Sequence, residues 1–259
     1  MRDIWKMNRP ALDRSSISEE EWALRSDLAA AFRLAYQFGG TESVGNHFSA
    51  VLPGGGTTFL MNPFWMLFSE IRASDLMQLD WSETDRMEKP NPPDLSGWCI
   101  HSRIHALNPA AKVVLHIHSP YATALAGLKD PRIKPIDQVT ARFVNRVAYD
   151  LDFDDVAIST AEGDRLAAKI GQMPILMMGN HGVTACGATV AEAFEELYLF
   201  ERACRILVMA YNTGQPLNIL SDSVAHKVSG GWEGCHNMAH FHFAQLRFGL
   251  DRSNSDYTS

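Results

Sequence analysis

The segment Val113-Val114-Leu115-His116-Ile117-His118-Ser119 is typical of a buried β-strand that ends in two histidines spaced i, i+2. Side chains two residues apart on a strand point to the same face, so both imidazoles can reach one metal ion. The alternative is a pair of unrelated histidines, one hydrogen-bonded in the core and the other at the end of the strand. The rest of the chain has to distinguish a metal site from this alternative.

The composition is that of a globular protein with reduced cysteines. The 259 residues, 46% apolar and 20% charged, fit one large α/β domain. The formal net charge of -7, without any basic run, excludes nucleic acid as a partner. No apolar run approaches the roughly twenty residues that cross a bilayer, and no secretory signal opens the chain, so we expect a cytoplasmic protein without a membrane partner. Cys99, Cys186, Cys204 and Cys235 form no C-x-x-C pair, and we expect Cys186 and Cys204 to be thiols in the core.

Helical and extended patterns alternate along the chain, which predicts one domain of interleaved strands and helices. Helices are expected over residues 18–38, 73–76, 99–107, 120–128, 161–170 and 189–212, with a short one over 238–248. Strands are expected over residues 43–51, 57–62, 77–80, 113–119, 174–178 and 183–186, whereas 138–148 is ambiguous and ends extended at 147–149. We divide the chain into a flexible N-terminal arm (1–15), a metal-binding domain (16–220) and a C-terminal extension (221–259) that packs on the domain or on a neighbouring subunit.

A third histidine, His181, lies in the turn Gly179-Asn180-His181-Gly182 between two apolar strands. Such a turn can place a side chain at the edge of the sheet, and Gly182 allows the backbone to approach a ligand closely. The alternative is a plain turn, because Asn and Gly both tolerate positive φ. Together with His116 and His118, three neutral imidazoles would leave coordination positions open on a divalent zinc, iron or manganese ion, as in a catalytic metal site.

These motifs resemble the class II aldolase/adducin family when they are taken in order. They are Leu115-His116-Ile117-His118-Ser119, then Gly179-Asn180-His181-Gly182-Val183, then a long Ala-Glu-Ala-Phe-Glu-Glu helix, and the resemblance extends approximately from Ala29 to Pro216. The resemblance implies a three-layer α/β/α domain around a largely antiparallel central sheet, with His116, His118 and His181 as ligands of a divalent metal ion (Zn, Fe or Mn). It also implies a small-molecule substrate and a homo-oligomer, a tetramer, with the site near a subunit interface.

The sequence departs from the sugar-phosphate aldolases of the family at the acid/base glutamate. Gly97 occupies the Glu position, in Ser96-Gly97-Trp98, and a glycine cannot transfer a proton. The family's phosphate loop corresponds to Pro63-Phe64-Trp65, where Phe64 and Trp65 supply neither hydroxyl donors nor the close backbone approach of a glycine. A phosphorylated sugar is therefore disfavoured, and an apolar or aromatic substrate becomes more plausible. The alternative is that Phe64 and Trp65 form a subunit contact.

The segment Gly97-Trp98-Cys99-Ile100-His101-Ser102 resembles the adducin-type branch of the family. That branch includes the non-enzymatic adducin head, together with bacterial proteins that resemble metal-dependent decarboxylases of aromatic acids and iron-dependent oxygenases of aromatic hydroxy acids. Because all three metal histidines are present here, we expect the chemistry to be retained. The substrate contacts expected from the resemblance are Asn46, Phe64, Trp65, Gly97 and Trp98.

Two histidines outside the metal set are the candidates for acid/base work. His101 lies in the helix before the metal strand, and His47 follows Asn46, which matches a substrate-contacting position of the family. Either can shuttle a proton near neutral pH. For each, the alternative is a histidine that donates to a backbone carbonyl behind the site or in the core. We expect His105, one turn after His101, to face solvent.

Further side chains are assigned less directly. Tyr149 lies where family members place a tyrosine, and we expect it to contribute an acidic hydroxyl, either within its own subunit or across a subunit boundary. The residues Cys235, His236, His240 and His242 form a second candidate metal cluster, although a tail that packs over a neighbour's cleft is the better interpretation.

The leading functional hypothesis is a divalent-metal-dependent lyase that breaks a C–C bond of an unphosphorylated, aromatic or keto acid. Decarboxylation is favoured over retro-aldol cleavage because it needs no general base to begin. The second hypothesis is an Fe(II)-dependent oxygenase of an aromatic hydroxy acid on the same three histidines. The third is a non-enzymatic, adducin-like interaction module with a vestigial site.

Overall fold

A central β-sheet organises the chain, for which a computed structural model describes residues 12–152, 157–233, 235–253 and 255–259. In this part of the chain the sheet has seven strands in the order β3-β2-β1-β4-β7-β6-β5. The strands are β1 (His47–Val51), β2 (Thr58–Met61), β3 (Met77–Asp80), β4 (Val113–Ile117), β5 (Val147–Asp150), β6 (Ile175–Met178) and β7 (Gly182–Gly187). Neighbouring strands run antiparallel except for β5 and β6. The predicted largely antiparallel sheet is therefore confirmed, with β4 in its middle.

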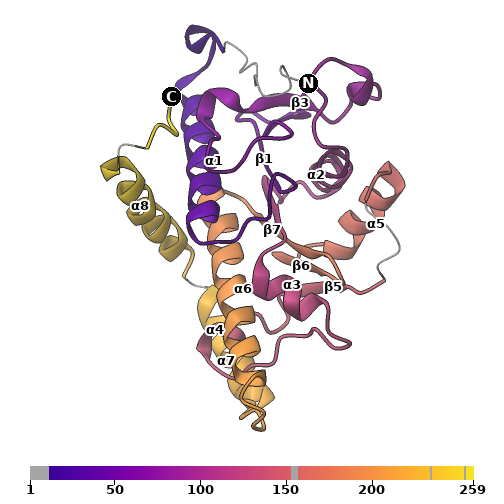
Figure 1. Ribbon diagram of the computed structural model, residues 1–259, viewed down its shortest axis with the longest axis vertical. Coiled ribbons are helices and arrows are strands. Elements are labelled where there is room, and N and C mark those ends of the chain that lie inside the picture. Colours follow the sequence, from indigo (N-terminus) through magenta and orange to yellow (C-terminus); the bar gives the residue numbers. More distant parts are fainter. Residues whose placement is uncertain (1–11, 153–156, 234, 254) are drawn as a thin grey trace.

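Helices cover both faces of the sheet. They are α1 (Glu19–Gln37), α2 (Leu95–Leu107), α3 (Pro120–Ala126), α4 (Gln138–Ala141), α5 (Thr160–Ile170), α6 (Val190–Tyr211), α7 (Asp222–Glu233) and α8 (His236–Arg252), with short 3₁₀ turns at Arg14–Ser16, Ala73–Asp75 and Arg86–Glu88. Figure 1 shows α2 and α5 on one side of the sheet and α1 and α6 on the other. This arrangement confirms the three-layer α/β/α fold.

Successive side chains of β4 pack into the cores on opposite faces of the sheet. Val113, Leu115 and Ile117 pack into the core that the sheet forms with α1 and α6. Val114 points the other way, into the smaller core beneath α2 and α5. His116 lies two residues further along the strand, so it shares the face of Val114, on the side of the sheet that α2 covers.

Some predicted element boundaries were wrong for local reasons. Helix α2 begins at Leu95 rather than near Cys99, because the Asp94 carboxylate accepts a hydrogen bond from the Gly97 N–H at 2.8 Å and caps an earlier turn. The ambiguous stretch resolves into the single turn of α4 followed by β5. The predicted capping of α1 is present, since the Ser18 hydroxyl accepts from the Glu21 N–H at 3.1 Å.

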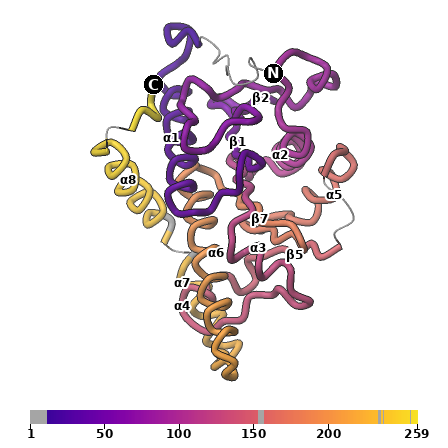
Figure 2. The backbone as a smooth tube through the Cα atoms, viewed as in Figure 1, coloured from indigo at the N-terminus to yellow at the C-terminus, as the bar shows by residue number. Residues whose placement is uncertain are grey.

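The C-terminal segment folds back on the domain as two helices, where the sequence predicted only a short one. Helix α8 packs on α6 and α1, and Figure 2 shows it as the outermost helix on that side. Beyond it, Tyr257 is fully buried, and its carbonyl accepts a hydrogen bond from Ala73. The proposed domain boundaries stay predictions, and residues 1–11 of the expected N-terminal arm lie outside the described residues. Across the described residues, every helix falls short of the length and apolarity that a bilayer span requires.

Candidate metal centre

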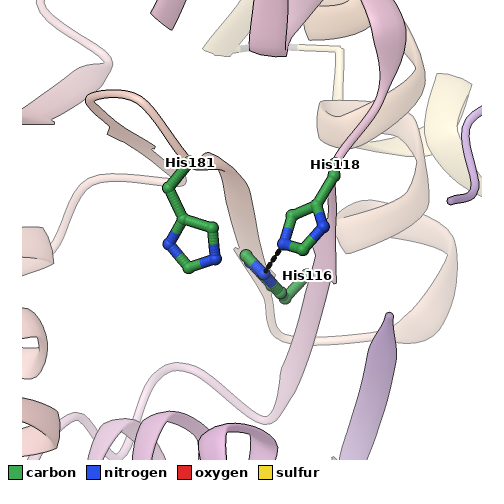
Figure 3. A group of neighbouring side chains, drawn as sticks. All are labelled: His116, His118 and His181. Atoms are coloured by element: carbon green, nitrogen blue, oxygen red, sulfur yellow. Dashed lines mark hydrogen bonds between the residues drawn. The ribbon is translucent and has the colours of Figure 1, made fainter. Parts of the chain in front are cut away.

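Three imidazoles converge at one end of the central strands. His116 is on β4, His118 follows the end of that strand, and His181 lies in the turn between β6 and β7, so that all three rings gather in one place (Figure 3). The Nε2 atoms of His116 and His118 are 3.0 Å apart, and one ligand atom from each of the three residues lies within 4.8 Å of the others. Within the described residues this is the one group of three or more potential ligands close enough to hold a metal ion.

The outer nitrogens of two of these rings are already occupied. The Nδ1 atom of His116 lies 3.1 Å from the hydroxyl of Thr184 on β7, and Nδ1 of His118 lies 2.8 Å from a carboxylate oxygen of Glu42. When each Nδ1–H donates to these oxygens, both Nε2 lone pairs point toward the shared centre. Partners of this kind fix the ring orientation and the tautomer of metal-binding histidines. The donor set therefore fits a divalent metal ion.

The turn that carries His181 depends on two neighbouring residues. Asn180 adopts φ 55°, the left-handed conformation that Asn tolerates in a turn. At Gly182, a Cβ atom would lie 2.6 Å from the carbonyl oxygen of Ile117 and 2.8 Å from the ring of His118. Gly182 thus permits a close approach, but to the end of β4 rather than directly to a ligand. This contact brings His181 beside the His-x-His pair.

Burial keeps two of the three histidines in the neutral form that metal ligation requires. Burial lowers the pKa of His116 well below its usual range and lowers that of His181 to about 4. Both imidazoles are therefore neutral near neutral pH. Three nitrogen ligands leave further coordination positions for substrate or water, which is the arrangement of catalytic rather than structural metal sites.

A cleft of about 710 Å³ opens over His118 and His181. Its polar lining includes Glu42, Asp94, Ser96, Thr123 and Asn180, whereas no lysine or arginine lines it among the described residues. The Thr123 hydroxyl is buried and has no hydrogen-bond partner in the described part of the chain. Sequence reasoning missed Asp94 because the start of α2 was placed too late, and it missed Glu42 because that residue lies in an irregular loop.

His47 lies next to the metal histidines, on the adjacent strand. It is opposite His116 in the pairing of β1 with β4, and the two rings stack with centroids 4.7 Å apart. Its Nε2 atom is 3.5 Å from the Ser96 hydroxyl and 3.8 Å from the Asp94 carboxylate. Burial lowers the pKa of His47 to about 4, although the negative charge of Asp94 acts in the opposite direction.

The end of the Met61 side chain and the His47 ring together fill the space above Gly97. A Cβ atom at position 97 would lie 3.0 Å from two carbons of this ring and would overlap the end of Met61. A side chain at this position, where the resemblance predicts the acid/base glutamate of sugar-phosphate aldolases, would therefore have to displace the Met61 methyl group and the His47 ring. The lack of a side chain at Gly97 makes room for the His47 imidazole. The predicted contact of Gly97 with substrate stays a prediction.

His101 and His105 both lie behind His47, in the interface between α2 and the sheet. His101 is completely buried and its Nε2 atom is 2.8 Å from Nδ1 of His47, so it reaches the cleft only through that residue. The expectation that His105 faces solvent was wrong, because it is only 3% exposed. Residues four apart share one face of a helix, so the inward orientation of His101 brings His105 inward as well.

The aromatic residues predicted to contact substrate lie elsewhere in this chain. Trp98 is buried and stacks on Phe59 with ring centroids 6.0 Å apart. Phe64 and Trp65 pack against each other at 4.0 Å, and Trp65 is 68% exposed. None of Trp98, Phe64 and Trp65 is among the described residues that line the cleft. A role for them in substrate binding stays a prediction, as does a role for Phe64 and Trp65 in a subunit contact.

Asn46 and Tyr149 occupy different surroundings. The side-chain Oδ1 of Asn46 accepts from the Glu42 N–H at 2.7 Å, while its Nδ2 atom is buried without a hydrogen-bond partner among the described residues. The Tyr149 hydroxyl accepts from the N–H of Ile133 at 3.0 Å, and burial raises its pKa to about 12. In this chain the Tyr149 hydroxyl is therefore held by the loop between α3 and α4. Its catalytic role stays a prediction.

The C-terminal histidines are engaged by carboxylates of α6. Nδ1 of His242 is 2.5 Å from Glu195, and Nε2 of His240 is 3.6 Å from Glu192. These pairs join α8 to α6. A second metal site in this segment gains no support from the described residues.

Comparison with known proteins agrees with this geometry. Residues 26–208 match the sequence profile described as the class II aldolase and adducin N-terminal domain. A protein of Caulobacter vibrioides named for its resemblance to class 2 aldolases is 34% identical over 235 residues, which cover 86% of this chain and 91% of that protein. Alpha-adducin of Rattus norvegicus is 31% identical over 80% of this chain and 28% of its own length. The crystal structure of an aldolase II superfamily protein from Pseudomonas syringae superposes with a TM-score of 0.87 at 34% identity, covering 95% of this chain and 99% of that one. This chain belongs to the class II aldolase and adducin family.

Proposed function

We propose that this protein is a divalent-metal-dependent lyase that cleaves a C–C bond of an unphosphorylated acid, by decarboxylation in preference to retro-aldol cleavage. The enzymes of this superfamily are typically metal-dependent lyases, so the proposal concerns the substrate and the bond that breaks. The observation that carries it is the convergence of His116, His118 and His181 beside an open cleft, with the outer nitrogens of two of the rings already held.

The polarity of the cleft favours an unphosphorylated substrate. A doubly charged phosphate is usually held by arginine, lysine or several backbone N–H groups. The described residues that line this cleft include the carboxylates of Glu42 and Asp94 and, besides the metal histidines His118 and His181, no lysine or arginine. A substrate with a single carboxylate encounters less repulsion. The unpartnered hydroxyl of Thr123, which lines the cleft, is a donor that suits its oxygen atoms, and the unpartnered Nδ2 of Asn46, which lies outside the lining residues, is a second donor.

Each part of the proposed site has a separate task. A bound divalent ion supplies the Lewis acid charge that stabilises the electron pair left on the substrate when the C–C bond breaks. Asn46 and Thr123 orient the substrate oxygens. His47 transfers a proton from water to the carbon that has lost carbon dioxide, and the imidazolium that it forms on the way lies beside the Asp94 carboxylate. The hydroxide left by that water adds to the released carbon dioxide, so the products are the protonated substrate remnant and bicarbonate. His47 therefore takes over the proton transfer that a side chain at Gly97 cannot perform.

The experiment measures metal content and bicarbonate release with the same preparations. The wild type is purified without added metal, analysed by elemental mass spectrometry and assayed against aromatic, hydroxy and keto acids with and without a phosphate group. His116→Ala and His118→Ala are expected to lose both the bound metal and turnover. His226→Ala, at an exposed histidine of α7, is the matched control and should keep both. Full turnover by the metal-free wild type would rule out the proposal.

Two alternatives give distinct results in this experiment. An Fe(II)-dependent oxygenase needs molecular oxygen, so activity that disappears under anaerobic conditions would replace the lyase. The second alternative, a non-enzymatic interaction module, is supported by the similarity to alpha-adducin. That alternative requires a purified protein without stoichiometric metal.

A further inference from the structure

A continuous line of buried side chains runs inward from His47, between β1 and α2. His47 Nδ1 lies 2.8 Å from His101 Nε2, and His101 Nδ1 lies 2.5 Å from the hydroxyl of Ser49. The same hydroxyl is 2.7 Å from His105 Nε2, and His105 Nδ1 is 2.8 Å from the carbonyl oxygen of Ala111. We call His47, His101, Ser49 and His105 the buried relay; each is at most 3% exposed.

The backbone carbonyl determines the direction of every hydrogen bond in the buried relay. A carbonyl oxygen only accepts, so His105 carries its proton on Nδ1. Burial lowers the pKa of His105 to about 4, so the ring is neutral near neutral pH and its Nε2 is a bare acceptor. The Ser49 hydroxyl must then donate to His105 and accept from Nδ1–H of His101.

His101 connects this ordered pair of hydrogen bonds to His47. Burial lowers the pKa of His101 well below its usual range, so this ring is also neutral and its Nε2 accepts from Nδ1–H of His47. The opposite order would bring a lone pair of His105 Nδ1 against the Ala111 oxygen at 2.8 Å. A single order therefore satisfies all four contacts.

We propose that Ser49, His101 and His105 are positioning residues that hold the proton of His47 on Nδ1 and leave its Nε2 bare toward the cleft. Ser49, His101 and His105 make no hydrogen bond to the three metal histidines and do not line the cleft. They act only through His47. The link to catalysis rests on the proposed function, because a bare Nε2 makes His47 a proton acceptor at the start of the reaction. The tautomer itself exists whether or not the protein is a lyase.

The decisive variant is His105→Phe, which removes the fixed acceptor at the inner end of the buried relay. Phe suits the aromatic surroundings of His105, whose ring lies 5.2 Å from that of Phe59. Without His105, the Ser49 hydroxyl is free to donate to His101 instead. The order of the hydrogen bonds then reverses, and the proton of His47 moves from Nδ1 to Nε2.

Ser49→Ala is a second, smaller variant that interrupts the buried relay in the middle and leaves the tautomer of His47 unspecified. The matched control is Ser102→Ala, since Ser102 adjoins His101 in the sequence and is 2% exposed but is not part of the buried relay. The tautomer is read by solid-state NMR of ¹⁵N-histidine-labelled protein, both zinc-loaded and metal-free, because protonated and bare ring nitrogens have well-separated shifts. His47→Gln identifies the signals of His47 by their loss.

We expect the wild type and Ser102→Ala to carry the His47 proton on Nδ1, His105→Phe to carry it on Nε2, and Ser49→Ala to show both forms. With a substrate in hand, kcat of His105→Phe should fall by about 100-fold with little change in KM, since a misplaced proton disables acid/base transfer. A wild type protonated on Nε2, or a His47 tautomer unchanged in both relay variants, would overturn the proposal. If the tautomers are as expected but no acid is turned over, the proposed function alone fails.

Discussion

The acidity of the medium should control the stability of this fold through the histidines buried between β1 and α2, and His105 offers the clearest measurement. Burial lowers its pKa to about 4 in the folded protein, opposed by the hydrogen bond to the Ala111 carbonyl. In the unfolded chain the ordinary pKa of about 6.5 returns. Between these two values the unfolded state binds more protons than the folded state, so the free energy of unfolding decreases as the pH falls.

The size of the effect follows from the two pKa values. At pH 5.5 about nine-tenths of unfolded His105 is protonated, whereas folded His105 is almost entirely neutral, so acidification from pH 7.5 removes about 1.3 kcal/mol through this residue. His101 acts in the same direction, because burial also lowers its pKa. The stability attributed to His105 is thus complete above pH 6.5 and is lost progressively toward pH 4.

The assay is urea unfolding of the metal-free protein, followed by far-ultraviolet circular dichroism at pH 7.5 and 5.5 and at one protein concentration. His105→Phe should reduce the difference in unfolding free energy between the two pH values by about 1.3 kcal/mol. His226→Phe replaces an exposed histidine in the same way and is the control. An equal pH dependence in the wild type and in His105→Phe would refute the reasoning, because His105 would then bind protons equally in both states.

Three further predictions concern the site and the thiols. Glu42→Ala should weaken zinc affinity about 10- to 100-fold, because His118 loses the acceptor of its Nδ1–H. A competition titration with a chromogenic chelator measures this affinity, and an unchanged value would contradict the role of Glu42. Gly97→Ala should displace the His47 ring and lower kcat by about 100-fold, with circular dichroism unchanged, and retained turnover would show that the ring is not needed in its present place. In the native protein, Ellman's reagent should leave Cys186 unmodified, because burial raises its thiol pKa to about 12, and should modify the partly exposed Cys235 first; mass spectrometry of tryptic peptides checks the order.

The metal ligands could be predicted because their geometry follows from local rules. His116 and His118 share a face because side chains alternate between the two faces of a strand. The turn at Asn180 could be predicted because Asn and Gly tolerate positive φ. The order of the motifs then predicted the family and the layers of the fold. These features depend on short segments whose conformation the chain specifies by itself.

The surroundings of the metal ligands could not be predicted in this way. Thr184 meets His116 across paired strands that lie 68 residues apart, and Glu42 meets His118 from an irregular loop 76 residues away. Such partners depend on strand register and loop path, which sequence periodicity does not specify. The inward position of His105 is different, because the spacing of four residues from His101 already placed both on one helical face.

The absence of a glutamate at position 97 has a spatial explanation that residue types alone do not give. The family resemblance predicts that Gly97 marks the loss of a catalytic group from α2, whereas in three dimensions the same volume is filled by the Met61 methyl group and the His47 ring from β1. The two features depend on each other, because even a methyl group at position 97 would contact that ring. A proton-transferring side chain on the helix would therefore require the imidazole on the strand to move from its present place. His47 in turn requires the hydrogen-bonded residues behind it, which explains why a strand serine and two helix histidines are buried where apolar side chains would otherwise pack.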